Sequence, residues 1–122
     1  MSSFEYLDLE DLLQLVRHLG IGPVRDVGLL DSAAARPRSS PFGEDAYPSL
    51  SLKAAALLHS ITNSHALVEG SKRLAWLATT VFLDLHGLTP DLSDDEAFDM
   101  IWKVAGSSMD VEAIALRLGI TD

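Results

Sequence analysis

Apolar residues recur three and four positions apart along most of the chain, and the alternation typical of strands is nearly absent. This period places apolar side chains on one face of an α-helix, so it predicts helices rather than a sheet. The segment 9–19 is the clearest case. Its apolar stripe consists of Leu9, Leu12, Leu13, Val16 and Leu19. Asp8 can cap the start of this helix and Gly20 can end it.

Five further segments show the same period. Ser93 and Glu96 have the spacing of a capping box, in which two side chains bond backbone N–H groups reciprocally at a helix start. Residues 36–50 are rich in Pro, Ser and Gly and predict a loop. The further predicted helices cover residues 28–35, 51–63, 71–86, 93–105 and 110–118. Because 28–35 is short, the sequence predicts an all-α fold, a compact single-domain bundle of five or six helices over residues 1–122.

Two of these helices should be central. The run 53–58 is apolar nearly all round despite Lys53, and the helix over 71–86 carries apolar side chains on more than one side. Trp76 and Trp102 lie on apolar helical stripes, so both are expected in the core.

The composition excludes several classes of protein. Apolar residues make up 48% of the chain, which excludes a disordered tail protein. The absence of Cys excludes a disulfide framework and a Cys-based zinc site, and it fits a cytoplasmic protein. We see no signal peptide and no apolar run approaching the roughly 18 residues that a membrane span needs. The net charge of −9 disfavours nucleic acid as a partner and would suit a basic protein partner.

One segment breaks the local rules for helices. Gly70 and Ser71 stand at the start of a buried helix, where Gly allows a tight turn and Ser is a good N-cap. The first turn then carries Lys72 and Arg73, although a helix N-terminus already bears about half a positive charge and disfavours cations. A bound anion would resolve the conflict. Free backbone N–H groups, the helix dipole and the two cations would together form a phosphate-binding site.

Two chemically active side chains precede this anion site. His65 is of the type that most often serves as a general base near neutral pH. Glu69 could hold Mg²⁺, which binds through one or two carboxylates plus substrate phosphates. Together these are the parts that phosphoryl or nucleotidyl transfer requires. From the residues alone, the alternative is a loop histidine, a solvated carboxylate and an exposed basic pair.

The segment 65–73 resembles the signature of the Fic/Doc superfamily, and in particular its death-on-curing (Doc) branch. That signature has His followed by an aromatic residue, an acid, a small residue, Asn, Lys and Arg. His65 stands at the catalytic histidine, Glu69 at the metal-binding acid and Gly70 at the small residue. The basic pair at 72–73 matches the Lys-Arg of the Doc branch.

The resemblance covers most of the chain and includes two departures. Leu67 replaces the usual Phe, and Ser71 replaces the usual Asn of the anion loop. Residues 36–37 and 42–48 resemble the flap loop of the Doc family. Further similar blocks are residues 24–33, 53–55 and 76–78.

The resemblance implies the toxin of a toxin–antitoxin pair. Such a toxin transfers a phosphoryl group from ATP, or another nucleoside triphosphate, to a hydroxyl side chain of a protein target, which is elongation factor Tu for the family archetype. His65 would deprotonate that hydroxyl, and Glu69 would hold Mg²⁺. The nucleotide phosphates would be bound by Gly70, Ser71, Lys72 and Arg73.

Two alternatives stay open at this point. One is nucleotidyl (AMP) transfer to a protein side chain. The other is a degenerate Fic/Doc module that binds a partner or a nucleotide without turnover, which the short Ser71 side chain favours because it has fewer donors than Asn.

Control is expected from a second protein. Many Fic proteins carry an inhibitory helix with Ser or Thr four residues before a Glu that is followed by Gly or Asn. Here the Glu followed by Gly is Glu69 itself, and His65 stands four residues before it. The resemblance therefore implies an antitoxin in trans, whose disordered C-terminal segment folds onto the toxin.

Tyr47 and His59 are two further candidates for a role in function. Tyr47, in the flap-like loop, could contact a target or simply pack. His59 could join His65 and Glu69 in a metal triad, but this spacing matches no standard zinc pattern.

Overall fold

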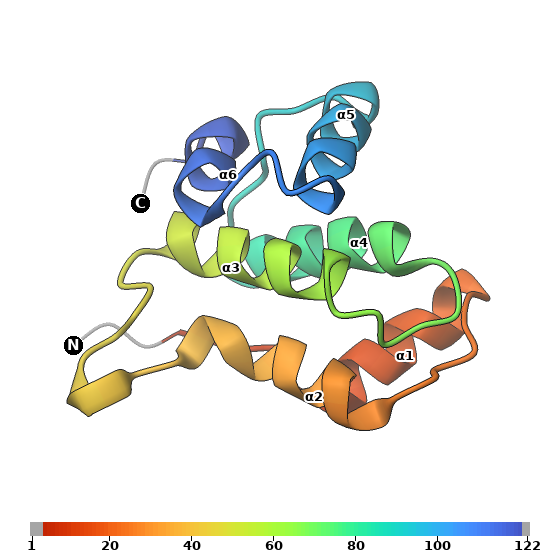
Figure 1. Cartoon of the computed structure of the whole chain (residues 1–122). Coiled ribbons are helices and arrows are strands. Elements are labelled where there is room, and N and C mark those ends of the chain that lie inside the picture. The colour runs from red at the N-terminus through yellow and green to blue at the C-terminus, as the bar shows by residue number, and fades with distance from the viewer. Residues whose placement is uncertain (1–3, 121–122) are drawn as a thin grey trace.

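The computed structural model of this chain describes residues 4–120 and is built from helices (Figure 1). Residues 1–3 and 121–122, which are the two ends of the predicted domain, lie outside the described residues. Within residues 4–120 there is no strand. The α-helices are α1 (Leu9–Leu19), α2 (Val27–Ala35), α3 (Leu50–Thr62), α4 (Ser71–Asp84), α5 (Asp94–Ala105) and α6 (Val111–Leu118). The all-α prediction is confirmed.

Most helix ends follow the capping rules. Asp8 caps α1 in a reciprocal capping box with Asp11, and Gly20 ends that helix with a φ of 65°. Ser93 and Glu96 form the predicted capping box at the start of α5. These boundaries were predictable because capping depends on residues within one helical turn.

Two local predictions were wrong. The segment 36–50 is not all loop, because it contains two short 3-10 helices, Arg36–Arg38 and Pro41–Gly43. The N-cap of α4 is Gly70 rather than Ser71, which is the first residue of the helix and caps no backbone group. Gly70 takes this position because its φ is 100°, a conformation that side-chain-bearing residues rarely adopt.

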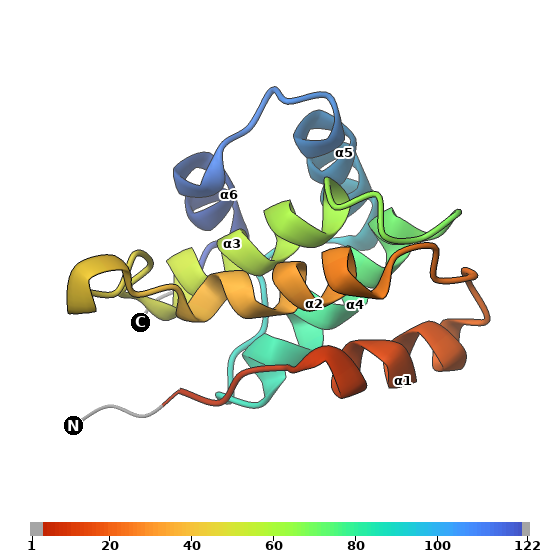
Figure 2. The same cartoon turned by 60° about the horizontal axis from the view of Figure 1, so that its bottom comes forward.

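The pair α3 and α4 forms the middle of the molecule. Figure 1 shows α5 and α6 on one side of this pair and α1 and α2 on the other. In the rotated view of Figure 2, α5 and α6 again lie above α3 and α1 lies below it, while α2 overlaps the pair. All residues from 53 to 58 are buried, so the prediction that α3 is central is confirmed. The α3–α4 connection, residues 63–70, lies at the opposite end of α3 from the flap-like loop 36–48 (Figure 1).

The two tryptophans differ from each other. Trp76 is partly buried and packs against the core, as predicted. Trp102 is 64% exposed on α5, so its predicted place in the core is wrong. Its helix buries Ala97, Met100, Ile101 and Val104, and this set leaves position 102 on the outer side.

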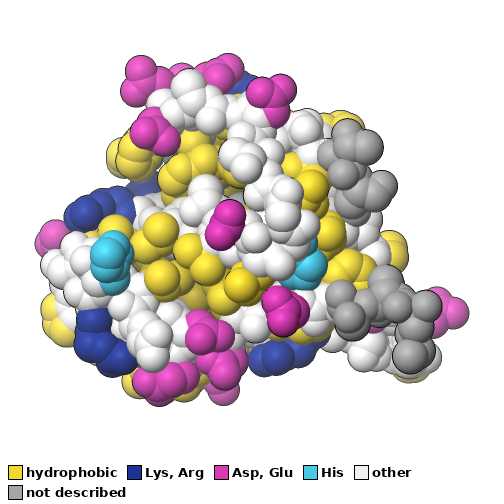
Figure 3. All heavy atoms as spheres, turned by 180° about the vertical axis from the view of Figure 1, so that it is seen from behind, with side chains coloured by type: hydrophobic (Ala, Val, Ile, Leu, Met, Phe, Trp, Pro, Cys, Tyr) yellow, Lys and Arg dark blue, Asp and Glu magenta, His cyan; other side chains and the backbone are white. Residues whose placement is uncertain are grey.

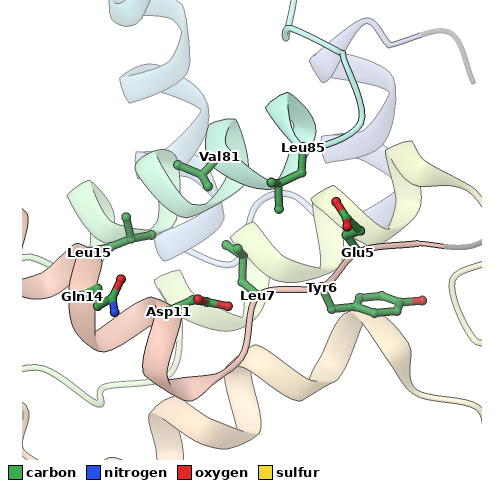
Figure 4. Close-up of a pocket in the computed structure, with 8 residues that line it drawn as sticks. All are labelled: Glu5, Tyr6, Leu7, Asp11, Gln14, Leu15, Val81 and Leu85. Atoms are coloured by element: carbon green, nitrogen blue, oxygen red, sulfur yellow. The ribbon is translucent and has the colours of Figure 1, made fainter.

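Apolar side chains also reach the surface. Figure 3 shows them gathered across the middle of the face that lies behind α3 in Figure 1. A groove of about 390 Å³ lies between the N-terminal segment, α1 and α4, and its lining includes Leu7, Leu15 and Val81 (Figure 4). None of the predicted site residues lines this groove. No described helix is long and apolar enough to cross a bilayer.

Candidate functional site

The loop 63–70 is fixed by a distant part of the chain. Residues 22–26 run beside residues 66–69 and are joined to them by backbone hydrogen bonds of 2.7 to 3.2 Å. Val24 and Leu67 form an isolated antiparallel bridge at the centre of this contact. The loop is therefore held in place by pairing as well as by packing.

The loop buries some side chains and exposes others. Ala66 and Leu67 are buried and anchor the loop in the core, whereas His65 and Glu69 are exposed. Leu67 thus fills a core position where the family signature has Phe. His65 has a φ of 55°, in the left-handed region that only a few per cent of non-glycine residues occupy, although His is enriched there. The buried neighbours hold the imidazole at the surface in this uncommon conformation.

The loop and the start of α4 border a cavity of about 570 Å³. Five of the six predicted site residues line it. They are His65, Glu69, Gly70, Ser71 and Lys72. Arg73 is exposed and is not among the lining residues. The structure therefore brings the predicted base, the carboxylate and most of the anion site together, and it leaves Arg73 outside.

Gly70 shapes the start of α4. A Cβ atom at this position would lie 2.6 Å from Cβ of Ile21, closer than real Cβ contacts allow. Both this contact and the positive φ require glycine. Within residues 4–120, no side chain caps this end of α4. The backbone N–H groups of the first turn are therefore available to a bound anion.

Lys72 interacts with the exposed Trp102. The Lys72 ammonium lies 4.4 Å from the centre of the Trp102 ring, a cation–π contact between α4 and α5. Lys72 also lines the cavity, so the exposed tryptophan holds a cation at the edge of the site.

Sequence reasoning missed several lining residues. Arg25 reaches the cavity from the segment before α2, and its Nη2 donates to Leu67 O at 3.1 Å. Thr62, the last residue of α3, also lines the cavity, as does Ser107 after α5. Only the pairing of residues 22–26 with the loop places Arg25 here. No local pattern signals a contact between segments so far apart in the sequence.

Charges of both signs meet at the cavity. Arg25 and Lys72 supply positive charge, in a chain whose net charge is −9, and Glu69 supplies a carboxylate. Among residues 4–120, no three His, Cys, Asp or Glu side chains group closely enough to hold a metal ion by themselves. Glu69 nevertheless fits Mg²⁺, which commonly takes one protein carboxylate and completes its shell with phosphate oxygens and water.

Comparison with known proteins identifies the family. The family model described as the Fic/DOC family matches residues 6–83. The chain belongs to the Fic/DOC family. It is also 48% identical over 118 residues to a curated protein named Toxin Doc from Mycolicibacterium smegmatis, an alignment that covers 93% of this chain and 91% of that protein.

The flap-like loop of this Fic/DOC protein does not border the cavity. None of residues 36–48 is among the lining residues. The Tyr47 hydroxyl instead accepts a hydrogen bond from Arg36 Nε at 2.9 Å, and Arg36 Nη1 lies 2.8 Å from His59 Nδ1. Burial and the nearby Arg36 guanidinium lower the pKa of His59, while Asp110 opposes them. His59 is therefore engaged with Arg36 and does not line the cavity with His65 and Glu69.

Proposed function

We propose that this Fic/DOC protein is a Doc-type toxin that phosphorylates a hydroxyl side chain of a protein target. The donor is ATP or another nucleoside triphosphate. The target is a translation factor, and elongation factor Tu is the first candidate to test. The observation that carries the proposal is the meeting of His65, Glu69 and Lys72 in one polar cavity at the uncapped start of α4.

Each residue has a defined task on this proposal. His65 takes the proton from the target hydroxyl, whose oxygen attacks the γ-phosphorus. The bond from that phosphorus to its bridging oxygen breaks, and the nucleoside diphosphate leaves. Lys72 and the first N–H groups of α4 bind phosphate oxygens, with Gly70 and Ser71 forming the turn and Arg73 at its outer margin. Glu69 would hold Mg²⁺, which supplies neutralisation of the phosphate charge.

The same set of residues could serve nucleotidyl transfer. If the α-phosphorus rather than the γ-phosphorus lay next to the target oxygen, AMP would be transferred and pyrophosphate would leave. The two reactions differ in the orientation of the nucleoside triphosphate in the site. Lys72 matches the Lys of the Doc signature, and this match favours phosphoryl transfer.

Ser71 supports a third candidate, a module that binds without turnover. Its hydroxyl is shorter than the Asn side chain of the family signature and has one fewer donor hydrogen. The catalytic-type residues His65 and Glu69 oppose this candidate, because a module without turnover has no need of both at one cavity.

The partner on this proposal is an antitoxin acting in trans in the cytoplasm. The similarity to a protein named Toxin Doc supports a toxin–antitoxin pairing. The inhibitory Ser/Thr-to-Glu motif of other Fic proteins is also absent from the sequence. A net charge of −9 would speed association with a basic segment of such a partner.

Intact-mass analysis of elongation factor Tu after incubation with this chain, ATP and Mg²⁺ tests the proposal. We expect a gain of one phosphate, and no gain with a His65→Ala variant. A gain of one AMP would establish nucleotidyl transfer instead. No gain on any candidate target, from protein that nevertheless binds ATP, would favour the module without turnover.

A further inference from the structure

Thr62 carries a buried hydroxyl without a partner. It is the last residue of α3 and is only 7% exposed. Within residues 4–120, its Oγ1 is the buried side-chain oxygen or nitrogen that lacks any hydrogen bond. Native proteins pair the large majority of such groups, so an exception calls for an explanation.

Other hydroxyls on the central helices behave differently. Three of them donate to a carbonyl of the preceding turn. Thr79 bonds Ala75 O at 2.7 Å and Thr80 bonds Leu77 O at 2.9 Å. Ser60, two residues before Thr62 on the same helix, bonds Leu57 O at 3.1 Å and Ala33 O at 2.9 Å. The orphaned state of Thr62 is therefore not a general property of α3 or α4.

The local geometry explains why Thr62 finds no partner three residues back in its own helix. The carbonyl at that position, on His59, already accepts two hydrogen bonds from Asn63. The Asn63 backbone N–H lies 3.2 Å from it and the side-chain Nδ2 lies 3.0 Å from it. A carbonyl oxygen has two lone pairs, so this acceptor is saturated.

Thr62 lines the same cavity as His65 and Lys72. Its Oγ1 is itself buried in the described conformation, so the side chain must turn to reach the cavity. We propose that the Thr62 hydroxyl turns toward the cavity when a nucleotide binds and donates its hydrogen bond to an anionic oxygen of that nucleotide. The inference rests on the proposed function and deepens it. The Thr62 hydroxyl would give the cavity a further hydrogen-bond donor. Ser71 has fewer donors than the Asn of the family signature.

The proposal predicts how one substitution affects both thermal stability and ATP affinity. Thr62→Val keeps the shape of the side chain and removes the hydroxyl. Without a ligand, the variant should be at least as thermally stable as wild type, because it removes an unpaired buried polar group. Its affinity for ATP with Mg²⁺ should fall by roughly tenfold, because a hydrogen bond to a charged group is lost.

Two control variants sharpen the test. Thr79→Val removes a buried hydroxyl whose bond to Ala75 is made, so it should lower the melting temperature and leave ATP affinity unchanged. Thr62→Ser keeps the hydroxyl and should keep wild-type affinity. Thermal unfolding without ligand and calorimetric titration with ATP and Mg²⁺ measure both quantities for each protein.

The outcomes separate this inference from the proposed function. If Thr62→Val is destabilised as much as Thr79→Val and binds ATP as wild type does, the inference is wrong, even if wild type phosphorylates a target. If wild type transfers nothing but binds ATP in a Thr62-dependent way, the proposed function fails and the inference stands. If wild type binds no ATP, both fail.

Discussion

The two ends of α3 each bury a polar side chain, and their surroundings are opposite. At the N-terminal end, Lys53 is fully buried. Its Nζ donates to Tyr47 O at 2.6 Å, pairs with Asp45 at 3.4 Å, and lies 4.6 Å from the centre of the Phe4 ring. This ammonium ties the loop 36–50 and the N-terminal segment to the core, and its partners come from both.

At the C-terminal end of α3, polar groups lack hydrogen-bond partners within the described residues. Thr62 has no partner for its buried hydroxyl within the described part of the chain, and no side chain there caps the start of α4. His65 and Glu69 are exposed beside the same cavity. A polar group whose demands are met within the chain contributes to stability, whereas a set of unmet groups around a cavity indicates a site for a ligand. The comparison therefore indicates that the N-terminal end of α3 stabilises the fold and that its C-terminal end borders a candidate ligand site.

The largest effect should come from His65. We expect His65→Ala to reduce transfer to a target by about 10² to 10⁴-fold, because a general base is lost. The free energy of unfolding should change little, because the side chain is exposed. Transfer rates and urea unfolding measure the two effects. Wild-type turnover by the variant would remove His65 from the mechanism, and a large loss of stability would place it with Lys53 as a structural residue.

Substitution of Lys53 tests the structural role of the N-terminal end of α3. Lys53→Met keeps the aliphatic stem and removes the ammonium, so we expect a loss of about 2 to 3 kcal/mol in the free energy of unfolding from the lost charged hydrogen bonds. ATP affinity of the folded variant should stay at the wild-type value. Arg17→Met is the matched control, because its ion pair with Glu10 at 3.6 Å is exposed and contributes little. Equal stability of the two variants would contradict the structural role of Lys53.

Much of the fold and of the candidate site could be predicted from the sequence. Helix positions, caps and the central place of α3 depend on patterns within a few residues. Apart from the N-cap of α4, these predictions agree with the structure. The cluster of His65, Glu69 and Lys72 was predictable for the same reason, because one loop and the next helical turn bring these residues together.

What escaped prediction depends on contacts that the side-chain pattern does not contain, and most of them are long-range. Arg25 reaches the cavity only through the pairing of residues 22–26 with 66–69. Trp102 has the period of a core residue but lies on the outer side of α5, where Lys72 covers its ring. The Thr62 case is local, because the two bonds that Asn63 makes to the His59 carbonyl occupy one acceptor that the Thr62 hydroxyl could have used. A side-chain pattern contains none of these relations.

The Ser71→Asn substitution tests whether the departure from the family signature at this position weakens ATP binding. We expect Ser71→Asn to strengthen ATP binding by up to about tenfold, since the longer amide adds a donor. Because Gly70 is the N-cap of α4, the change should leave stability nearly unaltered. Calorimetry with ATP and Mg²⁺ checks the affinity, with Ser108→Asn, an exposed position after α5, as control. A flat or weaker affinity would mean that Ser71 suits a different ligand.

Trp102 should have a smaller effect on the same site. Its ring holds the Lys72 ammonium at the cavity edge, and an exposed cation–π contact is worth about 0.5 to 1 kcal/mol. Trp102→Leu should therefore lower the free energy of unfolding by no more than about 1 kcal/mol and weaken ATP binding by roughly two- to fivefold. Phe98→Leu, also exposed on α5, is the control and should change neither. A Trp102→Leu variant that binds ATP as wild type does would show that the ring does not position Lys72.

The smallest effect concerns His59, which lies on α3 between Lys53 and Thr62. Its Nδ1 lies 2.8 Å from Arg36 Nη1, so we place it with Lys53 although it stands close to His65 in sequence. Burial, and then the charge of Arg36, lower the pKa of His59 in the folded protein, and Asp110 offsets this in part. The unfolded chain, with an ordinary histidine pKa of about 6.5, therefore binds a proton more readily than the fold does. Stability should fall as the pH falls below that value.

His59→Gln removes this titration while keeping an acceptor for Arg36. Urea midpoints measured at about pH 7.5 and about pH 5.5 should therefore differ less for the variant than for wild type. His18→Gln, at an exposed position on α1, should retain the wild-type difference. An unchanged pH dependence in His59→Gln would mean that neither burial nor the Arg36 contact favours the neutral imidazole.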